Sequence, residues 1–260
     1  RSRPARGLRL LVALAVFAMA FAPDSAPAES ILFVGNSFMY GARSPVKRYG
    51  AETVKDLNDA GFGGVPALFK AFTRQAGLDY EVSLETAGGT GLDFHYIHQL
   101  SVIDRKWDHV VLSSYSMLDE DRPGDPTMLI KYAELLAEVF RRRNPAVQIW
   151  LNATWSRADQ TYLKTGHWYG RPISAMANDI RAGCDLAVAN SGLLKGVIPV
   201  GQAWTRAMEA GIADPNPYDG LTFGKVDLWT YDQYHASAHG YYLEALVIFG
   251  SVTGQDPAVL

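Results

Sequence analysis

Short, almost purely apolar runs alternate along the chain with longer stretches in which apolar residues recur every three or four positions. The short runs predict strands at 30–35, 80–86, 108–114, 147–154 and 196–200. The longer stretches predict helices at 65–77, 125–143, 171–190, 201–211 and 237–254. Near-continuous apolar strands are typical of parallel strands buried on both faces. The alternation therefore predicts an α/β fold, with helices on both sides of a mostly parallel five-stranded sheet.

Size and charge narrow the possible classes of protein. The chain has 260 residues, of which 48% are hydrophobic, and a formal net charge of −3. This length suits one larger α/β domain. We expect no nucleic-acid partner, because such partners usually require a basic face.

The first 28 residues have the three-part pattern of a secretory signal peptide. Arginines precede the apolar stretch 8–22, and the small residues Ala26-Pro27-Ala28 follow it. We expect cleavage after Ala28, a mature domain at 29–260, and export to a bacterial periplasm or to the exterior. The alternative is an uncleaved membrane anchor, but the stretch is short for a span of about 20 residues. We therefore expect no stable membrane insertion after cleavage. The single cysteine, Cys184, excludes an intrachain disulfide and a cysteine-based metal site.

Polar and glycine-rich segments follow the predicted strands. Ser37 follows the first strand, "AGGTG" (87–91) the second, "SYS" (114–116) the third and "TWSRADQTY" (154–162) the fourth. In a doubly wound sheet, ligands bind beyond the carboxyl ends of the strands. We therefore expect these segments to lie along one edge, with Ser37 in a cleft.

A serine nucleophile needs a base, and the base needs an orienting carboxylate. Asp232 and His235 are three residues apart in "YDQYHASAHGYYLEAL" (231–246), just before the last predicted helix. That spacing lets Asp232 reach Nδ1 of the imidazole and leaves Nε2 free to face Ser37. The D-x-x-H pattern is common, and it gains weight here from the serine at the strand end.

Two segments resemble conserved blocks of the SGNH hydrolases, the GDSL-like esterases and lipases. "FVGNSFMYG" (33–41) resembles the first block, and 231–246 resembles the last. The resemblance implies a flavodoxin-like α/β/α sandwich that acts without a cofactor, with Ser37 as nucleophile, His235 as general base and Asp232 as its orienter. The G-x-S-x-G elbow of α/β-hydrolases is absent, since Met39 stands where its second glycine would be.

The same resemblance implies an oxyanion hole. The backbone N–H of Ser37 is one expected donor. "TAGGTGLDFH" (86–95) is similar to the second block and implies Gly89 as another, with Gly88 as the alternative. The third block of the family usually contains an asparagine, which this chain lacks. The substitute donors that we consider are Ser113, Ser114, Ser116 and Asn152.

Other residues are candidates for contact with substrate. Asn36 stands beside the nucleophile, and Trp155, Trp168 and Tyr169 fall in predicted loops near the cleft. Loop aromatics beside a serine suit sugar rings or acyl chains. Arg157 and Asp159 either pair with each other or line the entrance, and the sequence leaves both interpretations open.

Two other classes of site are possible. Asp232, His235 and His239 form a candidate metal site, although Ser237 favours a helix start there with His239 turned outward. The aromatic loops also suit a non-catalytic carbohydrate-binding protein, but that class gives no reason for Ser37, Asp232 and His235 together. The prediction is an exported serine esterase without metal or organic cofactor. Its expected substrate is an acylated, for example acetylated, carbohydrate, or secondly a lipid or small aryl ester.

Overall fold

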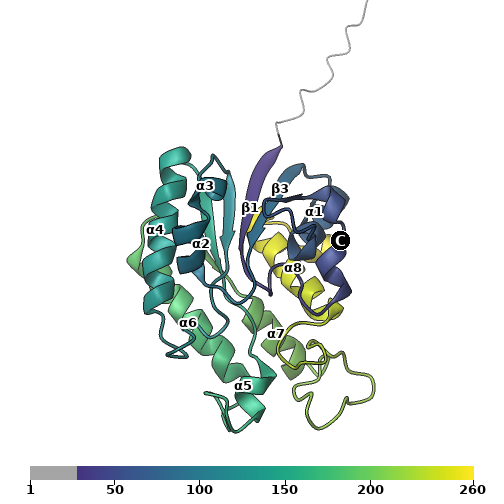
Figure 1. Ribbon diagram of the computed structural model, residues 1–260. Helices are drawn as coiled ribbons and strands as arrows, with labels where there is room; N and C mark the ends of the chain where they lie inside the picture. Colours follow the sequence, from purple (N-terminus) through teal and green to yellow (C-terminus); the bar gives the residue numbers. More distant parts are fainter. Residues whose placement is uncertain (1–27) are drawn as a thin grey trace, which may run out of the picture.

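The structure is a computed structural model that describes residues 28–260. Six parallel strands form one sheet in the order β2-β3-β1-β4-β5-β6 (Figure 1). The strands are β1 (Glu29–Gly35), β2 (Lys55–Asp56), β3 (Tyr80–Thr86), β4 (His109–Leu112), β5 (Gln148–Asn152) and β6 (Gly196–Ile198). The expected signal peptide falls almost wholly on residues outside the described part.

Helices cover both faces of the sheet. On one side lie α2 (Leu92–His98), α3 (Leu100–Ile103), α4 (Thr127–Arg143) and α6 (Ser174–Asn190). On the other side lie α1 (Gly64–Gln75), α7 (Val200–Glu209) and α8 (Ala238–Thr253). A short helix, α5 (Ala158–Tyr162), follows β5, and single 3-10 turns occur at Pro45–Arg48, Ala51–Thr53 and Pro257–Val259.

The central strand β1 shows why this sequence makes three layers. Ile31 and Phe33 pack into the core beneath α1 and α8, whereas Leu32 and Val34 pack beneath α2 and α4. All four side chains are fully buried. An apolar residue at every position is what a strand with a helix layer on each face requires.

The predicted three-layer α/β/α class is confirmed, with one difference in the sheet. All five predicted strands are present, but the sheet has a sixth, β2, at its edge. This strand has two residues and pairs with Ser83 and Leu84 of β3. Its Lys-Asp sequence carries no apolar signal, so the pattern could not reveal it.

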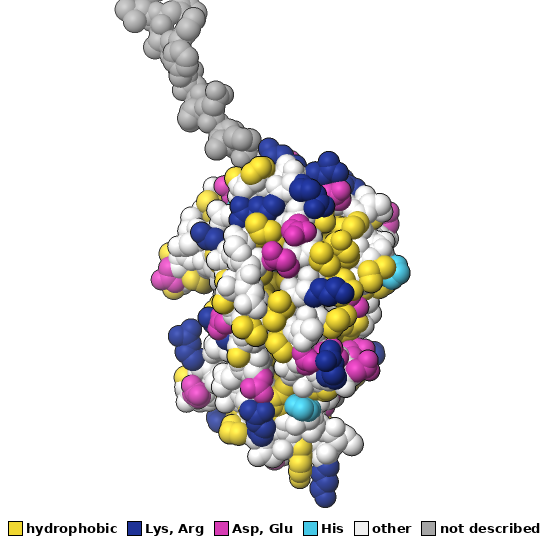
Figure 2. Space-filling view, turned by 90° about the vertical axis from the view of Figure 1, so that its left-hand side faces the viewer, with side chains coloured by type: hydrophobic (Ala, Val, Ile, Leu, Met, Phe, Trp, Pro, Cys, Tyr) yellow, Lys and Arg dark blue, Asp and Glu magenta, His cyan; other side chains and the backbone are white. Residues whose placement is uncertain are grey.

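The outer surface over α4 and α6 mixes hydrophobic side chains with charged ones of both signs (Figure 2). None of the helices in residues 28–260 combines the length and the apolar character that a membrane crossing requires.

Candidate active site

Ser37 lies at the carboxyl edge of the central strand. The chain turns sharply after β1, and the N–H groups of Met39 and Tyr40 both donate to Asn36 O, at 3.0 and 3.1 Å. A Cβ on Gly35 would stand 3.1 Å from the Cβ of Met39, so the glycine allows this close turn. Ser37 is mostly buried and lines a pocket, as expected.

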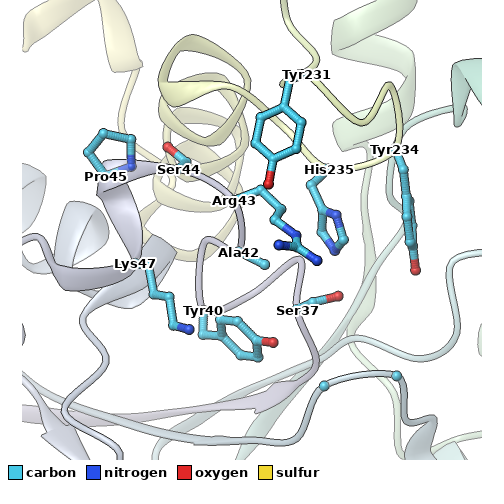
Figure 3. Close-up of a pocket in the computed structure, with 12 residues that line it drawn as sticks. Ser37, Tyr40, Ala42, Arg43, Ser44, Pro45, Lys47, Tyr231, Tyr234 and His235 are labelled. Atoms are coloured by element: carbon cyan, nitrogen blue, oxygen red, sulfur yellow. The ribbon is translucent and has the colours of Figure 1, made fainter.

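The pocket has a volume of about 790 Å³ and opens above the ends of β1 and β3. A pocket of this size can hold a ligand of one or two sugar rings. Its walls come from the turn after β1, the glycine loop after β3 and the segment before α8 (Figure 3). The lining residues are Ser37, Tyr40, Ala42, Arg43, Ser44, Pro45, Lys47, Gly88, Gly89, Tyr231, Tyr234 and His235.

Asp232 and His235 form the expected pair. Asp232 Oδ2 lies 2.7 Å from His235 Nδ1. The other oxygen, Oδ1, accepts from the backbone N–H groups of Tyr234 and His235, at 3.1 and 2.9 Å. The carboxylate therefore holds both the imidazole and the backbone that carries it. Ser237 caps α8 by accepting from Gly240 N, as predicted, which places the pair just before the helix.

The second nitrogen of His235 is free to act. Nε2 is buried and has no hydrogen-bond partner within residues 28–260. Figure 3 shows the imidazole of His235 directed towards Ser37, and both residues line the pocket. A proton on Nδ1, shared with Asp232, leaves Nε2 as an acceptor, which is the tautomer that a general base needs.

Burial and pairing set the charges of this pair. Burial lowers the pKa of His235, and the hydrogen bond and charge of Asp232 oppose that effect only in part. Burial alone would raise the pKa of Asp232, but the hydrogen bonds from His235 and Tyr234 outweigh it and lower this pKa. At neutral pH the site therefore holds a neutral imidazole beside an ionised carboxylate, ready to accept a proton.

Aromatic side chains pack behind Ser37 and His235. Phe38 stacks on Trp155 with ring centroids 4.2 Å apart, and Trp155 stacks on Trp204 at 4.6 Å. Tyr234 and Phe38 contact the His235 ring, with centroids at 4.1 and 5.6 Å. These contacts restrict the imidazole to one orientation.

This packing corrects the expectation for the loop aromatics. Trp155 is completely buried in the stack, so it contacts no substrate. Trp168 is also completely buried, and its Nε1 donates to Asp179 at 2.7 Å. Tyr169 is half exposed but does not line the pocket. The prediction that Trp155 and Trp168 bind substrate was wrong, because both side chains are buried by packing that the sequence pattern does not reveal.

Asn36 also differs from its expected role in substrate binding. Its Nδ2 donates to Thr90 O at 2.9 Å and to Ser114 O at 3.0 Å, while its Oδ1 accepts from Phe38 N at 3.1 Å. The side chain is buried and does not line the pocket. Asn36 therefore ties together the loops that follow β1, β3 and β4, and the expectation that it binds substrate is wrong.

Gly88 and Gly89 line the pocket with Ser37, where the expected oxyanion hole requires them. Gly89 has φ +70°, a conformation that favours glycine. Within residues 28–260, the backbone N–H groups of Ser37, Gly88 and Gly89 make no hydrogen bond. They are therefore available as donors to a substrate oxygen.

The candidates for a third donor do not reach the pocket. Asn152 Nδ2 donates to Glu244 on α8 at 2.7 Å, so the proposed role of Asn152 is wrong. Ser113, Ser114 and Ser116 also lie outside the pocket lining. Tyr40 does line it, and its hydroxyl lies 2.8 Å from where a Cβ on Gly88 would stand. Burial raises the pKa of Tyr40, which keeps this hydroxyl protonated as a donor.

A second buried acid–histidine pair stands behind the glycine loop, and the sequence analysis missed it. His95 Nδ1 hydrogen-bonds Glu85, and Asn58 Nδ2 donates to the same carboxylate at 3.1 Å. His95 Nε2 lies 3.3 Å from Thr90 Oγ1, which donates to Ala87 O at 2.8 Å. The pair thus supports the loop that carries Gly88 and Gly89. A glutamate within the apolar run of β3 was the available signal.

Arg157 and Asp159 pair with each other, which was the first of the two interpretations left open by the sequence. Two hydrogen bonds of 3.0 and 2.6 Å join the guanidinium to the carboxylate. The guanidinium carbon also lies 3.6 Å from the ring centroid of Tyr234, on which His235 packs. The ion pair therefore supports the base from behind, and neither residue lines the pocket.

In residues 28–260, no three or more His, Cys, Asp and Glu side chains are grouped to hold a metal ion. His239, the third ligand of the alternative metal site, is exposed on the first turn of α8.

The sheet order and the position of Ser37 after the central strand can now be compared with known folds. The chain has the fold of the SGNH hydrolases, the GDSL-like lipases and esterases. No family model matches the sequence, and no curated protein matches it. Three similar solved structures show the fold, all below a fifth in sequence identity.

The first of these is a DUF4886 family protein from Bacteroides uniformis. It has a TM-score of 0.62 and 18% identity, over 88% of this chain and 85% of that one. A putative GDSL-like lipase from Parabacteroides merdae has a TM-score of 0.57 and 15% identity, over 87% and 95%. A mutant of Axe2, an acetyl-xylooligosaccharide esterase from Geobacillus, has a TM-score of 0.54 and 14% identity, over 88% and 95%.

Proposed function

We propose that this protein is a serine esterase that hydrolyses carboxylic esters through an acyl-serine intermediate. One observation carries the proposal. The unpartnered Nε2 of His235, oriented by Asp232, faces the strand-end Ser37 in one pocket. His109 also has a buried ring nitrogen without a partner, so what distinguishes His235 is that it lines the same pocket as Ser37 and is paired with Asp232.

The reaction follows from the arrangement. Ser37 Oγ attacks the carbonyl carbon while His235 Nε2 takes its proton. The backbone N–H groups of Ser37 and Gly89 stabilise the oxyanion, each donor contributing about 3–4 kcal/mol. The ester C–O bond then breaks, and His235 returns the proton to the departing alcohol. Water then gives a proton to the same imidazole and attacks the acyl carbon. The bond from this carbon to Ser37 Oγ breaks, the acid leaves, and His235 returns the proton to Ser37 Oγ. Asp232 stabilises the imidazolium in both halves and remains ionised.

An acylated carbohydrate is the proposed substrate class. The pocket volume of about 790 Å³ suits one or two sugar rings. Three tyrosines, Tyr40, Tyr231 and Tyr234, line it and offer rings against which a sugar can pack. One protein with a similar fold is described as an acetyl-xylooligosaccharide esterase, which supports acetyl as the acyl group.

We also propose that the protein is exported and that residues 1–28 are removed. The basic, apolar and small-residue segments at the start of the chain support this. Expression in a bacterial host, fractionation, and N-terminal sequencing would test it, with Glu29 as the expected first residue. An uncleaved protein in the membrane fraction would contradict it.

The activity is tested by hydrolysis of p-nitrophenyl acetate and butyrate. The wild type is compared with Ser37→Ala and with Ser101→Ala, a matched control at an exposed serine on α3. We expect turnover that survives in the control and is lost in Ser37→Ala, with both variants melting like the wild type. Accumulation of an acetylated Ser37 in a mass spectrum would identify the intermediate. Equal, slow release by all three proteins would refute the proposal.

The alternative of a non-catalytic carbohydrate-binding protein receives less support. It rested on Trp155 and Trp168 as exposed platforms, and both are buried. It would be favoured only if the pocket bound sugars while p-nitrophenyl esters showed no turnover that depends on Ser37.

A further inference from the structure

Apart from His235 and the tyrosines, the only ionisable side chains among the described residues that line this pocket are two cations. Arg43 and Lys47 line it, and no aspartate or glutamate does. Both come from the segment that directly follows the nucleophile. Neither side chain makes a hydrogen bond to another group within residues 28–260. The nearest carboxylate to Arg43 is Asp232, whose Oδ2 lies 4.0 Å from Nε and is already bonded to His235.

A guanidinium has five N–H donors and an ammonium has three. The Arg43 side chain is 60% exposed, so solvent satisfies its donors in the free protein, and a ligand in the pocket can replace that solvent. Lys47 is instead held over aromatic rings, with Nζ 4.5 Å from the centroid of Phe62 and 5.3 Å from that of Tyr40. These rings restrict the position of the ammonium group without neutralising its charge.

The backbone at Arg43 is a second, independent observation. Arg43 has φ +62°, in the left-handed region that glycine adopts freely and that an arginine rarely does. The surroundings hold it there. Tyr241 Oη donates to the preceding carbonyl, Ala42 O, at 3.1 Å, and Thr230 Oγ1 donates to Arg43 O at 3.2 Å. A strained conformation maintained at a pocket wall points to a use for the side chain.

The position of Arg43 indicates which part of a substrate it would meet. Gly88 and Gly89 line the pocket with Ser37 and are the proposed partners of the carbonyl oxygen. Arg43 lies next to His235 in the same pocket (Figure 3). His235 delivers its proton to the departing alcohol, so the alcohol part must lie beside His235 and hence beside Arg43.

We propose that Arg43 and Lys47 form an anion subsite for the alcohol part of the substrate. The substrate class is then an ester of a carboxylate-bearing alcohol, such as an acylated uronic acid unit. This inference rests on the proposed esterase function and narrows its substrate. A planar guanidinium matches a carboxylate with two parallel hydrogen bonds, whereas a lysine ammonium adds a point charge.

The kinetic test uses two aryl acetates, anionic 4-acetoxybenzoate and its neutral methyl ester, with release of the phenol as the measured step. The variants are Arg43→Gln and Lys47→Gln, with Arg142→Gln at the exposed end of α4 as a control of equal charge change. We expect the ratio of kcat/KM for the anionic over the neutral ester to fall about tenfold in Arg43→Gln and less in Lys47→Gln. The ratio cancels effects on the triad, because both esters use it.

A third variant separates charge from backbone strain. Arg43→Gly removes the guanidinium but suits φ +62°. It should lose the preference for the anionic ester as fully as Arg43→Gln while melting no lower than the wild type. A preference for the anion that survives in both Arg43 variants would overturn the proposal, and so would a wild-type ratio unaffected by salt.

A binding measurement keeps this proposal separate from the proposed activity. Calorimetry of Ser37→Ala with methyl glucuronoside, and with methyl glucoside as the neutral control, needs no turnover. Binding of the glucuronoside alone, lost when Arg43→Gln is added, supports the subsite even if no ester is hydrolysed. Equal binding of both sugars, or of neither, overturns it, whereas loss of ester turnover alone counts against the esterase function.

Discussion

Glu244 on α8 is completely buried and makes one hydrogen bond, accepted by Oε1 from Asn152 at 2.7 Å. Glu244 Oε2 and Asn152 Oδ1 are buried acceptors without a donor within residues 28–260. Burial raises the pKa of Glu244 to about 8, and the hydrogen bond from Asn152 offsets this only in part. The carboxyl group is therefore protonated at neutral pH, and its proton adds a second donor to the one that Asn152 Nδ2 supplies.

This raised pKa makes stability fall as pH rises. The unfolded glutamate has its ordinary pKa of 4.5, so between that value and about 8 the unfolded chain releases a proton that the folded chain keeps. Each pH unit in this window lowers the free energy of unfolding by about 1.4 kcal/mol. From about pH 5 to about pH 8 the loss due to Glu244 is about 3–4 kcal/mol, because the slope weakens near each of the two pKa values.

Glu244→Gln removes this titration while keeping the shape. The amide can accept from Asn152 Nδ2 and donate to Asn152 Oδ1. We expect the variant to match the wild type near pH 5 and to be more stable by a growing margin up to about pH 8. Urea unfolding followed by tryptophan fluorescence measures the difference at each pH. Glu138→Gln, at an exposed glutamate on α4, is the control and should change nothing.

A difference in unfolding free energy between Glu244→Gln and the wild type that stays constant from pH 5 to pH 8 would refute this reasoning. It would mean that Glu244 ionises without cost in the folded protein, through water that reaches the base of α8.

Three further predictions concern the reaction. Asp232→Asn keeps an oxygen for the two backbone N–H groups but no longer fixes the tautomer of His235. The kcat for p-nitrophenyl acetate should therefore fall about 10³–10⁴-fold with little change in melting temperature. A fall below tenfold would count against the triad. Burial lowers the pKa of His235, and the imidazole must be neutral to act as a base. In a pH–rate profile, kcat/KM should therefore rise with pH and reach half its plateau below 6.5, the ordinary pKa of histidine. A midpoint above 6.5 would contradict the assignment of His235 as the base. Tyr40→Phe removes the hydroxyl beside Gly88 and should lower kcat about 10- to 100-fold if that hydroxyl completes the oxyanion hole. Unchanged kcat would leave only the backbone donors.

The sequence predicted the centre of the site better than its walls. Ser37 was recognisable because a fully apolar strand ends at it, and Asp232 with His235 because three residues of spacing suffice to join them. Each of these two features depends only on residues close together in the chain, so it can be recognised without knowledge of the fold.

Side-chain contacts between residues far apart in the sequence could not be predicted in this way. Trp155 follows a strand and resembles a loop aromatic, but Phe38 and Trp204 cover it on both faces. Asn152 lies at a strand end, from which its amide can point either to the pocket or to the helices. Its hydrogen bond to Glu244 directs it to α8. In each case the deciding neighbour is far away in the sequence, so composition and periodicity carry no signal for it.

The proposed nucleophile and its proposed base come from opposite ends of the sequence of the domain. Ser37 follows the first strand, His235 precedes the last helix, and Tyr241 of that helix donates from Oη to Ser37 O and Ala42 O, at 3.4 and 3.1 Å. A nascent chain that has left the ribosome only as far as α7 carries a serine without a base. On the proposed function, ester turnover requires the segment before α8 to be in place, so its recovery during refolding would report completion of the whole domain.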